Sequence, residues 1–196
     1  MLNEKLKKYH IILASASPRR HAFLKAMNID FEVRLHPVEE IYPNHLKGTE
    51  ITDVLAKLKS EAFKDKLKPA DILITSDTIV WLDNKAIAKP KDEVDAFRML
   101  KALSNKTHHV MTSICFTHQS KQRLVNTTTK VTFKALTDQE IRYYINTYKP
   151  LDKAGAYGIQ EWIGAIAITN IEGSYNNVVG LPTHLLYETL INITNG

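Results

Sequence analysis

A serine–proline pair and two arginines lie directly after the first apolar run of the chain, where they could bind an anion. Ser17 followed by Pro18 is typical of a helix start, with serine at the N-cap and proline at the first helical position. A helix N-terminus presents unpaired backbone N–H groups and the positive end of the helix dipole. Arg19 and Arg20 would repel that end of the helix unless an anion binds there, and guanidinium groups match phosphate oxygens well. The segment is therefore a candidate phosphate or triphosphate site.

These residues alone leave two interpretations open. In the first, a polyphosphate binds at the helix start, with Ser15 and Ser17 beside the two arginines. In the second, the helix is an ordinary capped helix whose arginines face water or pair with a carboxylate such as Glu40.

The other residues that could do chemistry are less distinctive one by one. Asp77 lies where an apolar strand ends, and such a carboxylate either forms a turn or serves as a catalytic or metal-binding group. Taken alone, the turn is favoured. Thr78 is typical of an ordinary strand residue, and Lys59, Lys89 and Glu40 are typical of solvated side chains.

Hydrophobic periodicity predicts the elements that must position these side chains. Apolar runs predict strands at residues 10–15, 30–36, 70–82, 107–118 and 122–134, with a hairpin turn at Asp83 and Asn84. Apolar stripes and N-cap residues predict helices at 17–28, 49–66, 92–103, from 137 onward and at 182–193. Several neighbouring strands look hairpin-connected. An α/β fold with a twisted mixed sheet flanked by helices is therefore favoured over a purely parallel sheet.

Finer expectations concern the faces and ends of these elements. The buried side of the helix at 17–28 is expected to include Ala22 and Ala26, and that of the helix at 92–103 to include Val94. Thr137 and Glu140 fit the capping-box pattern of a helix start. The polar residues 1–8 are expected to be disordered.

Length and composition bound the class of protein. The 196 residues fit a single domain, residues 1–196, with two lobes around a cleft. A net charge of +5 is mild, and the basic residues are scattered rather than clustered among aromatic residues, so a nucleic-acid partner ranks last. The single cysteine, Cys115, excludes an internal disulfide and is expected to be a buried thiol. No signal peptide or membrane-spanning apolar run is present in the sequence, which predicts a cytoplasmic protein without a membrane partner.

Several common site motifs are absent from the sequence. It contains no G-x-G-x-x-G, no P-loop motif, no H-E-x-x-H and no G-x-S-x-G, so the corresponding nucleotide-fold and hydrolase classes have no support. His108 and His109 are consecutive strand residues that face opposite sides, so they are not expected to bind one metal together.

Taken in order, the segments of this chain resemble the Maf family of nucleotide pyrophosphatases, from about Ile11 to Leu190. The segments that carry the resemblance are ILASASPRR, EE before YP, LAKLKSEAF, SDTIVWLDNKAIAKPKDEVDAFRMLKALS, HHVMTSI and PLDKAGAYGIQ…IEGSYNNVVGLP. The resemblance implies hydrolysis of a nucleoside triphosphate to the monophosphate and pyrophosphate, with a divalent cation such as Mg²⁺ or Mn²⁺.

The resemblance also assigns expected roles to single residues. It gives Asp77 the place of the proton acceptor. It links substrate choice to Arg19, Thr78 and Gln160, and places Glu40, Lys59 and Lys89 among the polar residues of the cleft. A triphosphate needs cationic partners, for which Arg20, Lys59, Lys89 and a metal are available. Because an ordinary aspartate is a weak base at neutral pH, Asp77 is expected to act on a metal-activated water or to hold the metal, together with Glu40.

The words S-P-R-R, S-D-T and G-I-Q resemble the branch of the family that acts on dTTP and UTP. The branch acting on 7-methylguanosine triphosphate carries a glutamate near the place of Gln160. This chain has Glu161 next to Gln160, where glycine is common in the family, and has Ala88 and Asn105 at two other common glycine positions. Thr78 and Gln160 can both donate and accept hydrogen bonds, as reading a pyrimidine edge requires.

Alternatives to a pyrimidine triphosphate pyrophosphatase remain. One is a nucleotide-binding regulator of cell division with little catalysis, because the family is also associated with inhibition of septum formation. Another is the 7-methylguanosine triphosphate activity. The sequence leaves the oligomeric state open, and a homodimer is the commonest assembly.

Overall fold

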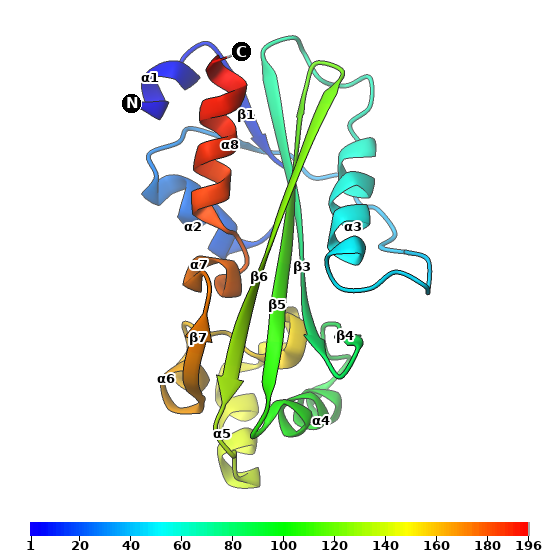
Figure 1. Cartoon of the computed structure of the whole chain (residues 1–196), viewed down its shortest axis with the longest axis vertical. Helices are drawn as coiled ribbons and strands as arrows, with labels where there is room; N and C mark the ends of the chain where they lie inside the picture. The colour runs from blue at the N-terminus through cyan, green and yellow to red at the C-terminus, as the bar shows by residue number, and fades with distance from the viewer. Residues whose placement is uncertain (196) are drawn as a thin grey trace. The chain divides into compact units, whose positions relative to one another are not determined.

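The computed structural model describes residues 1–195, and within them a seven-stranded sheet has the order β2-β1-β3-β5-β6-β7, with β4 paired to β3. The β1–β2 and β1–β3 pairs are parallel, whereas the β3–β4 and β6–β7 pairs are antiparallel. Helices flank this sheet (Figure 1), so the predicted α/β class with a mixed sheet is confirmed. The strands are β1 (His10–Leu13), β2 (Glu32–Val33), β3 (Asp71–Leu82), β4 (Lys85–Ile87), β5 (Thr107–His118), β6 (Lys121–Phe133) and β7 (Ile168–Glu172).

The chain divides into two compact units, in agreement with the two expected lobes. The first unit comprises residues 1–77, 112–127 and 180 onward, and the second comprises residues 78–111 and 128–179. Each of the strands β3, β5 and β6 contributes residues to both units. Neither unit is therefore a continuous piece of the chain.

In the first unit, apolar side chains line both faces of β1 and β3. One face packs into a cluster that includes residues of the helices α1, α2 and α8. The opposite face, represented by Ile12 and Leu73, packs against Phe63 in the turn after α3. Burial on both faces explains why these strands are continuous apolar runs rather than alternating ones. The helices of this unit are α1 (Leu2–Leu6), α2 (Pro18–Ala26), α3 (Thr49–Glu61) and α8 (Thr183–Asn195).

The N-terminal helix α1 overturns the expectation that residues 1–8 are disordered. Leu2 and Leu6 are one helical turn apart and are both buried, so that the short helix has one apolar face. α1 and α8 lie side by side in the first unit (Figure 1). Lys5 Nζ also donates a hydrogen bond to Asn195 Oδ1. The many polar residues of this segment hid the helical spacing of Leu2 and Leu6, so the helix was not predicted.

Polar side chains on the buried face of α3 find partners on β5 and β6. Thr52 Oγ1 lies 2.6 Å from Ser113 Oγ. Ser60 Oγ accepts a hydrogen bond of 2.8 Å from Gln122 Nε2, and the buried Cys115 Sγ lies 3.9 Å from the same oxygen. The expectation that Cys115 is a buried thiol is confirmed. The buried hydroxyl groups of Thr52 and Ser60 are thus paired, as burial of a polar group favours.

In the second unit, local sequence signals set the helix starts and the hairpin as predicted. The Asp92 side chain caps α4, and Thr137 and Glu140 form the capping box of α5. Asp83 and Asn84, with φ angles of 49° and 60°, form the turn between β3 and β4, in the left-handed region that such residues tolerate. The helices are α4 (Glu93–Leu103), α5 (Asp138–Tyr148), α6 (Trp162–Ala167) and α7 (Tyr175–Val179), with two 3₁₀ turns, η1 (Pro150–Asp152) and η2 (Ala154–Ala156).

Two helix faces differ from the expected ones. In α2, Ala22 and Ala26 are exposed and Leu24 is buried, because the helix turns its longer apolar side chain toward the sheet. In α4, Val94 is 68% exposed, and the buried face runs through Ala96 and the leucines that follow it. In both cases, helical spacing fitted more than one stripe, and packing against the rest of the unit selected one of them.

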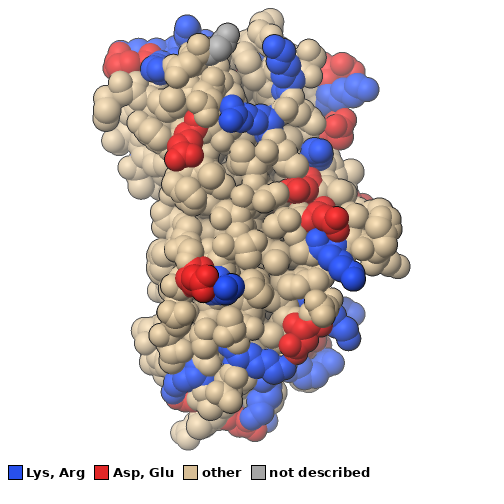
Figure 2. All heavy atoms as spheres, in the orientation of Figure 1, with Lys and Arg blue, Asp and Glu red and all other residues tan. Residues whose placement is uncertain are grey.

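Charged side chains of both signs are interspersed over the face of the molecule drawn in Figure 2. Among the described residues, every helix is too short or too polar to cross a lipid bilayer.

Candidate active site

The N-terminal end of α2 lies where the sequence predicted it, but the expected capping hydrogen bond is not formed. Ser17 is the N-cap and Pro18 opens the helix. The Ser17 side chain makes no capping hydrogen bond. Instead, the Ser17 backbone N–H donates to Ser15 Oγ at 3.2 Å. The turn between β1 and α2 is therefore held by Ser15, and the Ser17 hydroxyl is not used to cap the helix.

Arg20 lies at the centre of this turn and connects three segments of the first unit. Its Nε donates to the Gly180 carbonyl and its Nη1 to the Ser76 carbonyl, each at 2.9 Å. Nη1 also lies 3.4 Å from Ser15 Oγ. Burial lowers the pKa of the Arg20 guanidinium, and the charge of the nearby Asp77 carboxylate opposes that shift. Arg20 therefore fixes the backbone beside Asp77 and adds positive charge next to it.

Lys59 brings together the two carboxylates that the sequence suggested as metal ligands. Its Nζ lies 2.6 Å from Asp77 Oδ1 and 2.9 Å from Glu40 Oε1. Lys59 comes from the last turns of α3, Asp77 from β3 and Glu40 from the loop between β2 and α3. The Lys59 and Asp77 side chains are largely buried, whereas Glu40 is half exposed. Residues distant in sequence thus meet in one cluster that opens to solvent on the Glu40 side.

The residues of this cluster fit a divalent cation of the hard type. Two carboxylates converge on one positive centre, and Mg²⁺ is usually bound by one or two carboxylates with substrate phosphates and water completing its shell. Within residues 1–195, no group of three or more His, Cys, Asp or Glu side chains could hold a metal ion. A metal at Glu40 and Asp77 would therefore depend on ligands from a bound phosphate or water.

The residues expected to choose the substrate fall in different units. Arg19 is partly buried in the first turn of α2, and its charge acts on Arg20. Thr78, Lys89 and Gln160 belong to the second unit. Thr78 is partly buried, and Lys89 and Gln160 are exposed. The structure thus gathers Ser15, Arg20, Glu40, Lys59 and Asp77 in one unit and leaves three predicted residues in the other.

Gln160 projects from a tight turn. The Glu161 backbone N–H donates to the Gly158 carbonyl at 3.0 Å, which closes a four-residue turn. Ile159 points into the core of the unit and is 8% exposed, so the turn is anchored on one side while Gln160 faces solvent. The segment that carries Lys89 is tied nearby in the same unit, because the Ala88 carbonyl accepts a hydrogen bond from the Gly155 N–H at 3.1 Å.

Sequence reasoning missed the groups that hold the predicted residues in place. The carbonyls of Ser76 and Gly180, which accept from Arg20, are backbone groups without a side-chain signature. Tyr144 and Lys153, which contact the turn of Gln160, come from segments whose composition is typical of an amphipathic helix and a solvated loop. Arg20's backbone role had no sequence signal, because Ser76 and Gly180 are far from Arg20 along the chain.

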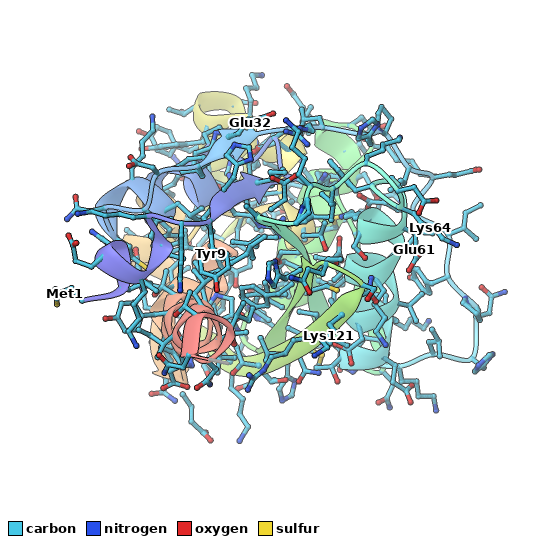
Figure 3. All side chains as sticks on the ribbon, turned by 90° about the horizontal axis from the view of Figure 1, so that it is seen from above. Met1, Tyr9, Glu32, Glu61, Lys64 and Lys121 are labelled. Atoms are coloured by element: carbon cyan, nitrogen blue, oxygen red, sulfur yellow. The ribbon has the colours of Figure 1, made fainter. Side chains whose placement is uncertain are left out.

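A pocket in the first unit is a separate feature from this cluster. It has a volume of about 690 Å³ and lies at the end of α3 and the tip of the β5–β6 hairpin. Glu61 is the last residue of α3, Lys64 lies in the turn that follows, and Lys121 is the first residue of β6 (Figure 3). None of the predicted site residues lines it. Asp77 therefore lies outside this pocket.

The fold and the site together define an α/β protein whose helix N-terminus, arginines and lysine-bridged carboxylates suit a polyphosphate ligand. The sequence profile described as Maf-like protein matches residues 10–193. The chain belongs to the Maf family.

Similar proteins span the whole chain. The dTTP/UTP pyrophosphatase of Flavobacterium johnsoniae is 60% identical over 190 residues, which cover 97% of this chain and 98% of that protein. The dTTP/UTP pyrophosphatase of Flavobacterium psychrophilum is 57% identical over 99% of this chain and 100% of that protein. That of Christiangramia forsetii is 53% identical over the full length of both.

Solved structures give more distant matches. The Staphylococcus aureus Ham1 protein aligns with a TM-score of 0.48 and 18% identity, over 63% of this chain and 71% of that chain. The nucleoside-triphosphatase, or dITP/XTP pyrophosphatase, of Mycobacterium abscessus aligns with a TM-score of 0.42 and 12% identity, over 95% of this chain and 96% of that chain.

Proposed function

We propose that this protein hydrolyses dTTP and UTP, and modified pyrimidine triphosphates of similar shape, to the nucleoside monophosphate and pyrophosphate. The relatives from Flavobacterium and Christiangramia carry that activity in their names and match the chain over nearly its whole length. We further propose that residues 1–196 act as one pyrophosphatase domain, in the cytoplasm and without nucleic acid or membrane as a partner. A homodimer is the assembly we expect.

The single observation that carries the proposal is the Glu40–Lys59–Asp77 cluster with Arg20 beside it. One ammonium group holds two carboxylates at 2.6 and 2.9 Å. Such an arrangement orients a carboxylate and places beside it a cation that can bind an incoming phosphate. A purely structural ion pair would need only one carboxylate, whereas hydrolysis of a polyphosphate uses both signs of charge.

The chemistry that follows from these residues is attack of water on the α-phosphate with pyrophosphate as the leaving group. The phosphoanhydride between the α- and β-phosphates breaks, and one proton leaves the water. Lys59, Arg20 and Lys89 supply positive charge for the phosphates and for the negative charge that grows on the pyrophosphate. A bound Mg²⁺ or Mn²⁺ would supply further positive charge and a more acidic water. Asp77 either accepts the proton of that water or holds the metal with Glu40.

Base selection falls to Arg19, Thr78 and Gln160 in this proposal. The side chains of Thr78 and Gln160 each have a donor and an acceptor, so they can pair with the carbonyl and N–H edge of uracil or thymine. A base that leaves these groups unpaired would be disfavoured, because unpaired polar groups in a site are costly.

Phosphate release with added inorganic pyrophosphatase tests the proposal. The purified chain is incubated with dTTP, UTP, CTP or 7-methylguanosine triphosphate, each with Mg²⁺ or Mn²⁺. We expect turnover of dTTP and UTP above the other two, and no turnover without metal. An inactive protein across the whole panel would refute the activity. Nucleotide binding without turnover would instead favour the regulator of cell division.

The Asp77→Asn variant tests the role of the central carboxylate. Loss of a general base or of a metal ligand lowers kcat by a factor of about 100 or more. Asp65→Asn is the matched control, since Asp65 lies in the turn after α3, outside the site, and has a positive φ that asparagine also tolerates. Near-normal turnover by Asp77→Asn, with the circular dichroism spectrum unchanged, would rule out the assigned role.

A further inference from the structure

The hydroxyl group of Tyr144 bridges the two ends of the turn that presents Gln160. Tyr144 lies on α5 and is fully buried. Its oxygen accepts a hydrogen bond of 3.0 Å from the Gly158 N–H and donates its proton to Glu161 Oε2. Gly158 and Glu161 are the first and last residues of that turn. One side chain thus closes the turn a second time, in addition to its backbone hydrogen bond.

The second carboxylate oxygen of Glu161 is held from another direction. Lys153 Nζ lies 3.0 Å from Glu161 Oε1, and the Lys153 side chain is only 11% exposed. Glu161 is also the N-cap of α6 but makes no side-chain capping hydrogen bond. An acidic N-cap normally turns its carboxylate to the first N–H groups of its helix. Here the carboxylate turns away from the helix and back across the turn.

Gly158 leaves the space in which this carboxylate lies. A Cβ atom at Gly158 would come within 2.9 Å of Glu161 Cδ and 3.0 Å of Lys153 Cε. A side chain at that position would therefore displace the Glu161 carboxylate and crowd the Lys153 side chain. The glycine, the tyrosine, the lysine and the glutamate form one interlocked set under the turn of Gln160.

We infer that Tyr144, Lys153 and Glu161 are positioning residues for base selection, which fix the turn of Gln160 without touching the base. This inference rests on the proposed role of Gln160 in substrate choice. It also gives a role to Glu161, the residue at a position where the family commonly has glycine. A glutamate that read the base directly would need a carboxylate oxygen for the ligand, whereas both oxygens of Glu161 already have partners within the protein.

A positioning role predicts a loss of base selectivity when the turn is loosened, whereas a purely structural role predicts only a loss of stability. A looser turn lets the Gln160 amide move away from the pyrimidine edge, and a displacement of about 1 Å is enough to cost a large part of an oriented interaction. The loss falls on the preferred base and not on the triphosphate, which every substrate shares. Selectivity, rather than total turnover, is therefore the quantity to measure.

Three variants test this: Tyr144→Phe, Glu161→Gln and the two combined. The measurement is the ratio of kcat/KM for dTTP to that for CTP, at a temperature below the melting point of every variant. We expect each single variant to lower the ratio by about tenfold, and the double variant to lower it no further, because both changes break one shared unit. Tyr143→Phe is the control. Tyr143 is half exposed on the same helix, and its ring packs on Trp162 without the hydroxyl.

Each outcome decides the question. A changed ratio in Glu161→Gln with an unchanged ratio in Tyr144→Phe would mean that Glu161 contacts the base, and would overturn the inference. Lowered melting temperatures with an unchanged ratio in both variants would mean a structural role only, and would overturn it too.

Binding separates this inference from the proposed activity. Titration with non-hydrolysable α,β-methylene analogues of dTTP and CTP measures base preference without catalysis. If the wild type binds the dTTP analogue preferentially but hydrolyses nothing, and Tyr144→Phe loses that preference, the activity is refuted and the positioning role stands. A wild type with no binding preference would overturn the positioning role.

Discussion

His108 is a buried titratable residue of the second unit, and its protonation makes the stability of the protein depend on pH. Its ring is fully buried between Phe133 and Tyr157, and its Nε2 lies 2.8 Å from the Tyr157 hydroxyl. Nδ1 has no hydrogen-bond partner among the described residues. Burial, and to a smaller degree the charge of His109, lowers the pKa of His108 from 6.5 to about 4. The folded protein therefore keeps this ring neutral.

The sign of the effect on stability follows from that lowered pKa. Above pH 6.5, the ring is neutral in both the folded and the unfolded chain. As the pH falls from 6.5 toward 4, the unfolded chain gains a proton that the folded chain does not, so the free energy of unfolding falls by about 3 kcal/mol through His108. In urea titrations between pH 4 and pH 7.5, we expect His108→Gln to lose less stability than the wild type. Parallel curves for the two proteins would contradict this.

At the residue scale, the sequence could suggest which side chains do chemistry but not what holds them. Arg19 and Arg20 stood out because two cations at a helix start are electrostatically unfavourable without an anion. Asp77 and Lys59 gained their meaning only through the family resemblance, since each alone is typical of a turn or a solvated helix. The bridge that Tyr144 makes could not be predicted, because a tyrosine on an apolar helix face is usually only a core residue.

At the scale of elements, two helices with serine or threonine N-caps are built differently. Thr137 Oγ1 accepts from the Glu140 N–H, and the Glu140 carboxylate accepts from the Thr137 N–H. Ser17 occupies the same position of α2 without a side-chain cap. The first cap belongs to stability. The Ser17 hydroxyl makes no capping hydrogen bond, and in the proposed site it would bind a phosphate at the helix start.

This contrast gives a prediction with a built-in control. Thr137→Ala should lower the free energy of unfolding by about 1 kcal/mol, because it removes a capping hydrogen bond. Ser17→Ala should lower it much less but raise the KM for dTTP. Urea denaturation and steady-state kinetics on both variants provide the check. An unchanged KM in Ser17→Ala would remove Ser17 from the phosphate site.

Element existence was easier to predict than element faces. The hairpin at Asp83 and Asn84 and the capping box at Thr137 are local signals, and both are confirmed. The helix α1 and the strand β7 were not predicted. A helix of five residues with two buried leucines shows too little periodicity to be recognised, and so does a strand within a glycine-bearing segment. Val94 was placed on the wrong face because the local stripe was ambiguous.

At the scale of the whole molecule, each unit is assembled from separate stretches of the chain. The strands β3, β5 and β6 belong partly to one unit and partly to the other, so unfolding of one unit would interrupt strands that continue into the other. We therefore expect the two units to unfold together, as one domain would.

Spectroscopy can test that expectation without any substitution. Trp81 and Trp162 both belong to the second unit, so tryptophan fluorescence reports on that unit, while far-ultraviolet circular dichroism reports on both. We expect the two signals to change at the same urea concentration. Separate midpoints would mean that the units are independent domains.

Cys115 is a chemical probe of the first unit, as the two tryptophans are optical probes of the second. It is the single thiol of the chain, lies in the part of β5 that belongs to the first unit, and is completely shielded from solvent. Burial also raises the pKa of the thiol and so suppresses the reactive thiolate. A colorimetric disulfide reagent can modify it only when that part of the sheet opens. Tryptophan fluorescence therefore reports on opening of the second unit, and the rate of Cys115 modification reports on opening of the first. Both rates can be measured without attaching a label.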